Sequence, residues 1–177
     1  ARARNLGLSL AKGRYIAYLD ADDYWTSNKL ERELAFLREK QAGFVFTGYE
    51  FGDENAKGTG KVVRVPGTLN YRQALANTTI FTSTVMLDTE KIDRSLMEMP
   101  CIKSEDTASW WRILKTGVTA YGLNENLVVY RRAGKSLSSN KIEALRRIWN
   151  LYRRAAGLSV FASACHFVPW AYRAVRR

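Results

Sequence analysis

Three carboxylates follow a short apolar stretch in the segment Tyr18-Leu19-Asp20-Ala21-Asp22-Asp23. The apolar run predicts a strand over residues 14–19, and open α/β sheets bind their ligands at the carboxyl ends of such strands. Carboxylates this close raise one another's pKa unless a cation or hydrogen-bond donors compensate. Mg²⁺ suits the role because it takes one or two carboxylates together with substrate phosphates. The alternative is an acidic turn whose side chains accept backbone N–H groups and cap the next helix.

A second acidic pair, Glu105-Asp106, opens a predicted helix that ends at Gly117. A carboxylate projecting from a helix start into a pocket can act as a general base. The alternative is structural, because acidic residues in a first helical turn are stabilised by the helix dipole by roughly 0.3–1 kcal/mol. The spacing along the chain does not place this pair beside Asp22.

Basic and hydroxyl side chains gather after the predicted strand at residues 126–131, in the segment Tyr130-Arg131-Arg132-Ala133-Gly134-Lys135-Ser136-Leu137-Ser138. Arginine, lysine and hydroxyl groups are the donors that proteins use to hold phosphate oxygens. The segment therefore indicates a diphosphate site between these donors and a metal on the acidic loop. A solvated basic loop is the alternative.

The elements that must position these groups alternate at first between helix and strand. Helices are predicted at residues 1–12, from Asn28 to near Gly43, at 70–76 and at 105–117. Strands are predicted at 14–19, 44–51, 61–65, 79–87, 118–122 and 126–131. Asn28 and Glu31 have the spacing of a capping box, and Leu30, Leu34 and Leu37 form an apolar helix face. This order predicts a mixed α/β sheet with appended hairpins and terminal helices.

Composition sets the outer limits of the function. The 177 residues are 46% hydrophobic and carry a net charge of +11, which is typical of a globular domain with a polyanionic partner. Two cysteines and one histidine argue against a disulfide framework, a metal cluster and histidine catalysis. A reducing compartment follows as the default, and the sequence shows neither a signal peptide nor an apolar run of about 20 residues.

The positive charge is concentrated in a basic tail, residues 141–177, which holds eight Lys or Arg and a single acid, Glu143. Two amphipathic helices are predicted there, at roughly 140–156 and 158–176. Basic helices with aromatic residues suit an anionic membrane surface. The alternative is that their apolar stripes pack on the rest of the chain.

Several short sequence blocks follow one another along residues 1–141. They are Ala3-Arg4-Asn5-x-Gly7, Ala11-x-Gly13-x-Tyr15-Ile16, Leu19-Asp20-Ala21-Asp22-Asp23, Trp25-x-x-x-Lys29-Leu30-Glu31, Thr82-Ser83-Thr84-Val85-Met86, Ser104-Glu105-Asp106-x-x-x-Trp110 and Tyr130-Arg131-x-x-x-x-Ser136-Leu137-Ser138-Ser139-Asn140-Lys141. This ordered set resembles the glycosyltransferases of family 2, and most of all bacterial enzymes that build capsular, teichuronic-acid or lipopolysaccharide chains.

The resemblance implies a GT-A fold, a catalytic domain at residues 1–140 and inversion at the anomeric carbon of a nucleotide sugar. By likeness, Asp22 is the chief ligand of Mg²⁺ or Mn²⁺ and Asp20 lies near the ribose or the metal. Asp106 is implied as the base, with Glu105 supporting it. The implied donor-binding residues are Arg4, Asp20, Arg131, Ser136 and Ser138. The first strand and an Asp-Asp-Gly-Ser element of the family have no counterpart here, so the domain is expected to be incomplete at its N-terminus.

The sequence thus predicts transfer of a sugar, most readily from a UDP-sugar, to a hydroxyl of a glycan or lipid-linked acceptor. The expected location is cytoplasmic, peripheral on the inner face of the bacterial membrane. Two other functions remain open at this point: a metal-dependent phosphoesterase using Asp20, Asp22 and Asp106, and a basic nucleic-acid-binding module. The absence of a recognisable nucleic-acid motif argues against the second.

Overall fold

The computed structural model describes residues 1–131 and 141–176, and a mixed seven-stranded sheet lies at its centre. Five strands follow one another in the order β1 (Tyr15–Ala17), β6 (Val85–Asp88), β3 (Phe44–Gly52), β7 (Ala120–Arg131) and β2 (Tyr24–Trp25). Two more pair at the sides, β4 (Gly58–Val63) with β3 and β5 (Thr68–Leu69) with β7. Only β3 and β7 run parallel, and the predicted mixed α/β sheet is confirmed.

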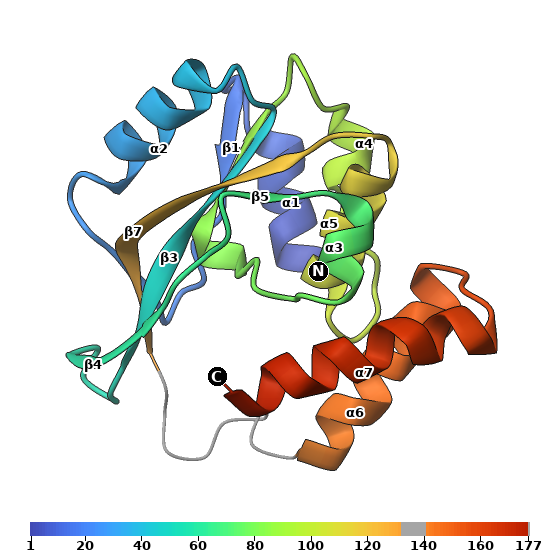
Figure 1. The fold of residues 1–177 in the computed structure, drawn as a ribbon. Coiled ribbons are helices and arrows are strands. Elements are labelled where there is room, and N and C mark those ends of the chain that lie inside the picture. The colour runs from blue at the N-terminus through green and yellow to red at the C-terminus, as the bar shows by residue number, and fades with distance from the viewer. Residues whose placement is uncertain (132–140, 177) are drawn as a thin grey trace.

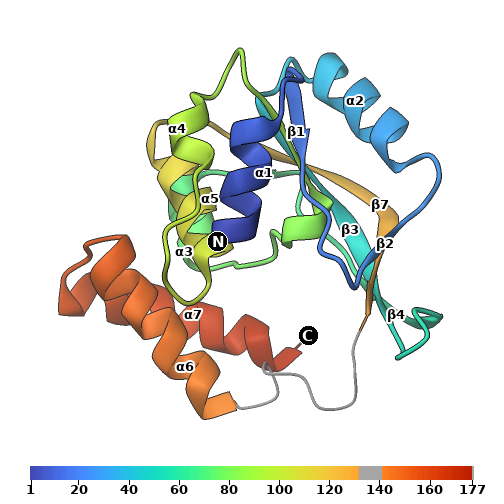
Figure 2. The ribbon, with the colours of Figure 1, turned by 180° about the vertical axis from the view of Figure 1, so that it is seen from behind.

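Helices cover both faces of this sheet (Figure 1). On one face lies α2 (Lys29–Glu39). Figure 2 shows the other face, with α1 (Arg2–Leu10), α3 (Tyr71–Leu75), α4 (Arg94–Met97) and α5 (Glu105–Lys115). The alternation of side chains along β3 explains the division. Val45 packs toward α2, whereas Phe44 and Phe46 enter the larger core on the other side, where Trp110 meets Phe44 edge to face.

The helix α2 differs from the prediction made from its leucines. Leu30 is 47% exposed, and the buried positions are Lys29, Glu33 and Leu37, one helical turn apart. The Lys29 ammonium pairs with Glu33 and lies 4.2 Å from the centre of the Trp25 ring, which compensates its burial. Burial raises the pKa of Glu33 to about 7, although Lys29 opposes the rise. The predicted capping box does not form, because the Asn28 side chain makes no capping hydrogen bond.

Two strand predictions also change. The stretch predicted as one strand at 79–87 contains a 3₁₀ turn, η1 (Thr82–Thr84), before β6 begins at Val85. The predicted strands at 118–122 and 126–131 form the single strand β7, whose register with β3 shifts near residues 123–126. A shift of this kind bends a strand without ending it.

The basic tail forms two helical segments that lie side by side beneath the sheet and its helices (Figure 1). They are α6 (Lys141–Asn150), continued by a π-helical turn at Leu151–Ala155, and α7 (Val160–Arg176). Tyr152 is fully buried, stacks on Trp111 at 5.3 Å and donates a hydrogen bond to the Leu75 carbonyl. Trp170 donates to Thr78 from α7. The first helix therefore packs on the rest of the chain, and none of the described helices could span a membrane.

Candidate active site

The acidic loop after β1 places its three carboxylates in three different surroundings. Asp20 is partly buried, Asp22 is exposed, and Asp23 is only 6% exposed. The backbone N–H of Asp23 donates to the Asp20 carbonyl at 3.0 Å, which closes the loop into a tight turn. The turn holds the negative charges close together, so each of them needs compensation.

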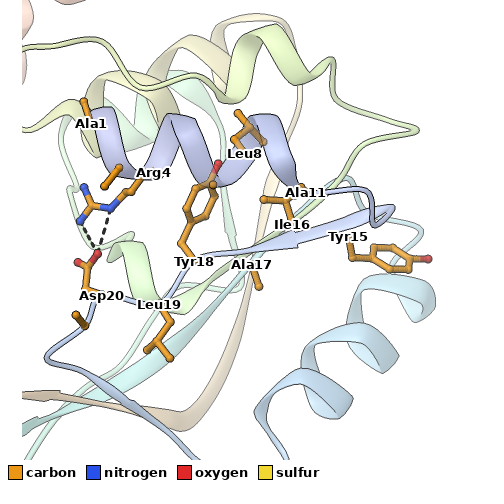
Figure 3. A pocket seen from close by; sticks show the side chains of 13 residues that line it. Ala1, Arg4, Leu8, Ala11, Tyr15, Ile16, Ala17, Tyr18, Leu19 and Asp20 are labelled. Atoms are coloured by element: carbon orange, nitrogen blue, oxygen red, sulfur yellow. Dashed lines mark hydrogen bonds and ion pairs between the residues drawn. The ribbon is translucent and has the colours of Figure 1, made fainter.

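Arg4 of α1 compensates the first carboxylate. Its Nε and Nη2 donate to one oxygen of Asp20, at 3.1 and 2.5 Å (Figure 3). Its Nη1 donates to Glu105 at 2.8 Å. The pKa of Arg4 is raised, because the hydrogen bond and charge of Asp20 and the charge of Glu105 outweigh the lowering effect of burial. One guanidinium therefore joins the acidic loop to the start of α5.

Arg4 and Asp20 lie at one end of a cavity of about 680 Å³ between α1 and β1 (Figure 3). Its wall is mostly apolar, with Leu8, Ile16 and Tyr18 on the sides. Arg4 and Asp20, which are paired with each other, supply the charged groups at its rim.

The third carboxylate, Asp23, is held by hydrogen bonds. Ser83 of the η1 turn donates to one of its oxygens at 2.5 Å, and the backbone N–H of Arg131 donates to the other at 3.3 Å. Burial raises the pKa of Asp23 to about 6, with a contribution from Asp20 and Asp22, against the lowering effect of the two hydrogen bonds. Asp23 thus fixes the loop to η1 and to the end of β7.

Ser83 connects more than one group. Its hydroxyl oxygen accepts a hydrogen bond from the backbone N–H of Asp20 at 3.1 Å while it donates to Asp23. Its carbonyl accepts from the Trp25 indole at 2.7 Å. The contact between Ser83 and Asp23 was not predicted from the sequence. The signals available were the third acid of the loop and the unbroken hydroxyl run Thr82-Ser83-Thr84.

Asp106 lies in the first turn of α5 and is held by the residue next to Ser83. One of its oxygens accepts from the Thr82 hydroxyl at 3.0 Å, and the other accepts from the Thr107 N–H at 2.6 Å. The pKa of Asp106 is raised, because burial and the charge of Glu105 outweigh the lowering effects of these hydrogen bonds and of Arg4. A carboxylate with a raised pKa is a stronger base than an ordinary one.

Asp106 faces a second cavity, of about 330 Å³, on the side of the chain toward the tail. Aromatic rings form much of the wall: Phe81 lies 5.2 Å from Tyr49 and 4.6 Å from Tyr130, between ring centres. Arg147 of α6 lines the same cavity. Aromatic faces beside a few polar groups are suited to the apolar faces and hydroxyls of a sugar.

The structure brings most of the predicted site residues together. Arg4, Asp20 and Glu105 are in direct contact, and Asp106 is linked to them through the η1 turn. Arg131 reaches the loop through its backbone N–H. Ser136 and Ser138 lie outside the described residues.

The carboxylate oxygens of the acidic loop fit a divalent cation whose coordination shell is completed by oxygen atoms of a bound ligand. Within residues 1–131 and 141–176, no cluster of three or more His, Cys, Asp or Glu could hold a metal by itself. Asp22 is exposed, and only one oxygen of Asp20 is occupied by Arg4. Two hard carboxylates with open coordination positions match the way in which Mg²⁺ or Mn²⁺ binds through protein and phosphate oxygens together.

The fold of this chain matches those of solved structures over nearly its whole length. Over 96% of its length, the chain matches TarS 1–349 of S. aureus in complex with UDP-GlcNAc, with a TM-score of 0.58 and 17% identity, and covers 50% of that chain. It matches the mannosyltransferase PcManGT of Pyrobaculum calidifontis in complex with GDP-Man and Mn²⁺ with a TM-score of 0.63, 17% identity and coverage of 97% and 48%. The fold is that of the GT-A glycosyltransferases.

The sequence matches give the family. Residues 1–95 match Glycosyl transferase family 2. The putative teichuronic acid biosynthesis glycosyltransferase TuaG of Bacillus subtilis is 41% identical over 99% of this chain and 69% of its own length. The UDP-Glc:alpha-D-GlcNAc-diphosphoundecaprenol beta-1,3-glucosyltransferase WfaP of Escherichia coli is 36% identical over 86% of this chain and 59% of its own. The chain belongs to glycosyltransferase family 2, and it spans about 60–70% of these relatives.

Thr82→Val tests the link between η1 and Asp106. The substitution removes a hydrogen bond that favours the charged carboxylate, so the pKa of Asp106 is expected to rise further above its ordinary value. Carboxyl NMR titration measures this directly, with Asp106→Asn identifying the resonance. Thr79→Val is the matched control, because Thr79 is buried in the wall of the same cavity and its hydroxyl has no hydrogen-bond partner among the described residues. Identical titration in the two variants would contradict the assignment.

Proposed function

We propose that this chain transfers a glycosyl group from a nucleoside-diphosphate sugar to a hydroxyl of a lipid-linked glycan, with inversion and with a divalent metal. The observation that carries the proposal is the η1 turn, whose Ser83 binds the acidic loop and whose Thr82 binds Asp106. The turn therefore holds two groups at a fixed separation. One is the acidic loop, which is suited to a metal-bound diphosphate, and the other is Asp106, which is suited to accept a proton. Family membership favours this reaction over a phosphoesterase or a binding module.

In the proposed reaction, Asp106 takes the proton of the acceptor hydroxyl. The hydroxyl oxygen forms a bond to the anomeric carbon from the face opposite the diphosphate, which inverts the configuration. The bond from that carbon to the diphosphate oxygen breaks, and its electron pair leaves with the nucleoside diphosphate. The raised pKa of Asp106 supports its role as the base.

Asp22 and the free oxygen of Asp20 are proposed to hold the metal, and Arg4 keeps Asp20 in position. When bound, Mg²⁺ or Mn²⁺ would neutralise the charge that develops on the departing diphosphate. Glu105 has a positioning role, since its ion pair with Arg4 connects the start of α5 to the acidic loop. Arg131, Ser136 and Ser138 are proposed as further contacts to the donor.

The nature of the substrates is proposed from the relatives. TarS was crystallised with UDP-GlcNAc, and the name of WfaP specifies a UDP-Glc donor and a diphosphoundecaprenol-linked acceptor. We therefore favour a UDP-sugar as donor and a lipid-linked glycan as acceptor. Such an acceptor places the enzyme at the inner face of the bacterial cytoplasmic membrane, as a peripheral protein.

The surface of α7 supports membrane contact. Phe161 is 81% exposed, and Val168 and Tyr172 follow it at helical spacing on the same exposed stripe. The opposite side of α7 packs inward through Phe167 and Trp170. An exposed apolar stripe on a basic helical pair is suited to an anionic bilayer surface.

Asp106→Asn is expected to reduce transfer by at least 10²-fold, since general-base catalysis typically contributes 10²–10⁴-fold. Affinities for donor and metal should stay at the wild-type value, because Asp106 touches neither in the proposed site. Steady-state turnover and calorimetry in the full-length protein measure the two effects. Asp53→Asn, in the β3–β4 hairpin, controls for the loss of an acid. Near-normal turnover in Asp106→Asn would remove it from the mechanism.

Asp22→Ala is expected to weaken metal-dependent donor binding about tenfold or more, because it removes one of two proposed carboxylate ligands. Calorimetry with a UDP-sugar, in Mn²⁺ and again in EDTA, separates the metal-dependent part of the affinity. Glu54→Ala removes an exposed acid from the same hairpin as Asp53 and should change neither titration. Equal affinities of Asp22→Ala and wild type in Mn²⁺ would count against the metal site.

Phe161→Ser is expected to lower partitioning onto anionic vesicles by about tenfold or more, since burying a phenylalanine side chain contributes about 1.5–3 kcal/mol. A point substitution is preferable to deletion of the tail, because Tyr152 belongs to the core. Leu30→Ser on α2, also an exposed apolar residue, is the control. Flotation with neutral vesicles completes the test: equal binding to neutral and anionic vesicles would exclude the electrostatic contribution.

A further inference from the structure

One face of α6 and its π-helical continuation is rich in arginine. Its members follow at intervals of three and four residues, which places them along a single side of the helix. They are Glu143, Arg146, Arg147, Asn150 and Arg154. The opposite side is anchored in the core by Ile148, Leu151 and Tyr152. The charged face is therefore held in a fixed orientation and cannot turn inward.

This face and Ile102-Lys103, in the loop before α5, line a groove of about 380 Å³, here termed the basic groove. It contains four cationic side chains and one carboxylate, Glu143, which pairs with Lys103 at 2.5 Å. The pKa of Glu143 is lowered by Lys103 and by the nearby charges of Arg146 and Arg147. Across the described part of the chain, Arg146, Arg147 and Arg154 form no ion pair with a carboxylate.

The basic groove lies between two other cavities and shares wall residues with both. Arg147 and Leu151 also line the cavity that contains Asp106. Ile102 and Arg154 also line a groove of about 370 Å³ on the other side, where Tyr71 and Pro100 provide partly exposed apolar surface beside Arg112 and Lys115. The order along the surface is therefore the carboxylate of Asp106, then a group of cations, then a wall with apolar side chains that also carries Arg112 and Lys115.

A lipid-linked glycan has the same order of groups: a sugar hydroxyl, a diphosphate and a hydrocarbon chain. We propose that the basic groove binds the diphosphate of a lipid-diphosphate acceptor, so that its sugar enters the Asp106 cavity and its lipid begins at the apolar groove. This inference rests on the proposed function and names the part of the acceptor that the tail recognises. Arginine side chains suit the role because they bind phosphate oxygens in pairs.

The donor's diphosphate is not the occupant of this groove. The donor is assigned to Asp20 and Asp22, which lie in the loop after β1 and do not line the basic groove. A free phosphate compound would use the cations but would gain nothing from Ile102, Pro100 or Tyr71. The apolar continuation therefore favours a diphosphate that carries a hydrocarbon chain.

Direct binding tests the inference without turnover. Decyl diphosphate and inorganic pyrophosphate are titrated into the full-length protein by calorimetry in EDTA, which suppresses metal-dependent binding at the donor site. We expect decyl diphosphate to bind more tightly than pyrophosphate. Arg146→Gln and Arg154→Gln should each weaken decyl diphosphate about tenfold. Arg38→Gln, which removes an exposed arginine from α2, should have no effect. Unchanged affinity in both groove variants would overturn the proposal.

Ile102→Ser separates the two sources of the diphosphate. It should weaken decyl diphosphate several-fold and leave pyrophosphate unchanged. If Ile102→Ser changes the affinity for neither compound, and pyrophosphate binds as tightly as decyl diphosphate, the proposal that the occupant is lipid-linked is wrong. In transfer assays, Arg146→Gln should raise the KM for a lipid-diphosphate acceptor and leave kcat and the donor KM unchanged. Wild-type transfer with an unaffected KM in this variant overturns the inference alone. Diphosphate binding through Arg146 and Arg154 without any transfer overturns the proposed function instead.

Discussion

The hydrogen bonds of the η1 turn are the constraint on which the rest of this site depends. Thr82 and Ser83 are buried neighbours in the chain, yet their hydroxyls bind carboxylates that are more than eighty residues apart. In a regular strand, adjacent side chains point to opposite faces. In a 3₁₀ turn, with three residues per turn, neighbouring side chains point instead in directions about 120° apart around the helix axis. The strand predicted across this stretch fails for that reason, and the turn that replaces it fixes the distance between the acidic loop and Asp106.

Crowded negative charge in the loop is resolved by giving each carboxylate a different environment. Asp20 is paired with Arg4. Asp23 is buried and hydrogen-bonded, and its pKa is raised to about 6. Asp22 is left exposed. Because two of the three acids are committed to protein partners, the loop keeps its shape in the absence of a ligand. The remaining coordination capacity faces outward, where a cation and a diphosphate can complete it.

The sequence was sufficient to predict the order of elements and the acids at their ends, because both depend on local signals such as apolar runs and helix starts. It was insufficient wherever a distant partner decides the outcome. Lys29 and Glu33 are buried, against their polarity, since Trp25 and their own ion pair compensate them. Leu30, an ordinary core candidate, is exposed because that pair occupies the inner face of α2. Ser83 and Asp23 gave no local signal that they would meet.

The tail illustrates how packing and recognition can share one helix. Tyr152 is stacked on Trp111 and hydrogen-bonded to Leu75, so α6 and its π-helical continuation belong to the same core as α3 and α5. That attachment orients the opposite face, and Arg147 on this face forms part of the wall of the cavity that contains Asp106. If the helix were held only by charges on the surface, salt would screen those interactions and the arginines would have no fixed position. The buried aromatic contact therefore gives the arginines of α6 a defined position, with Arg147 in the wall of the Asp106 cavity.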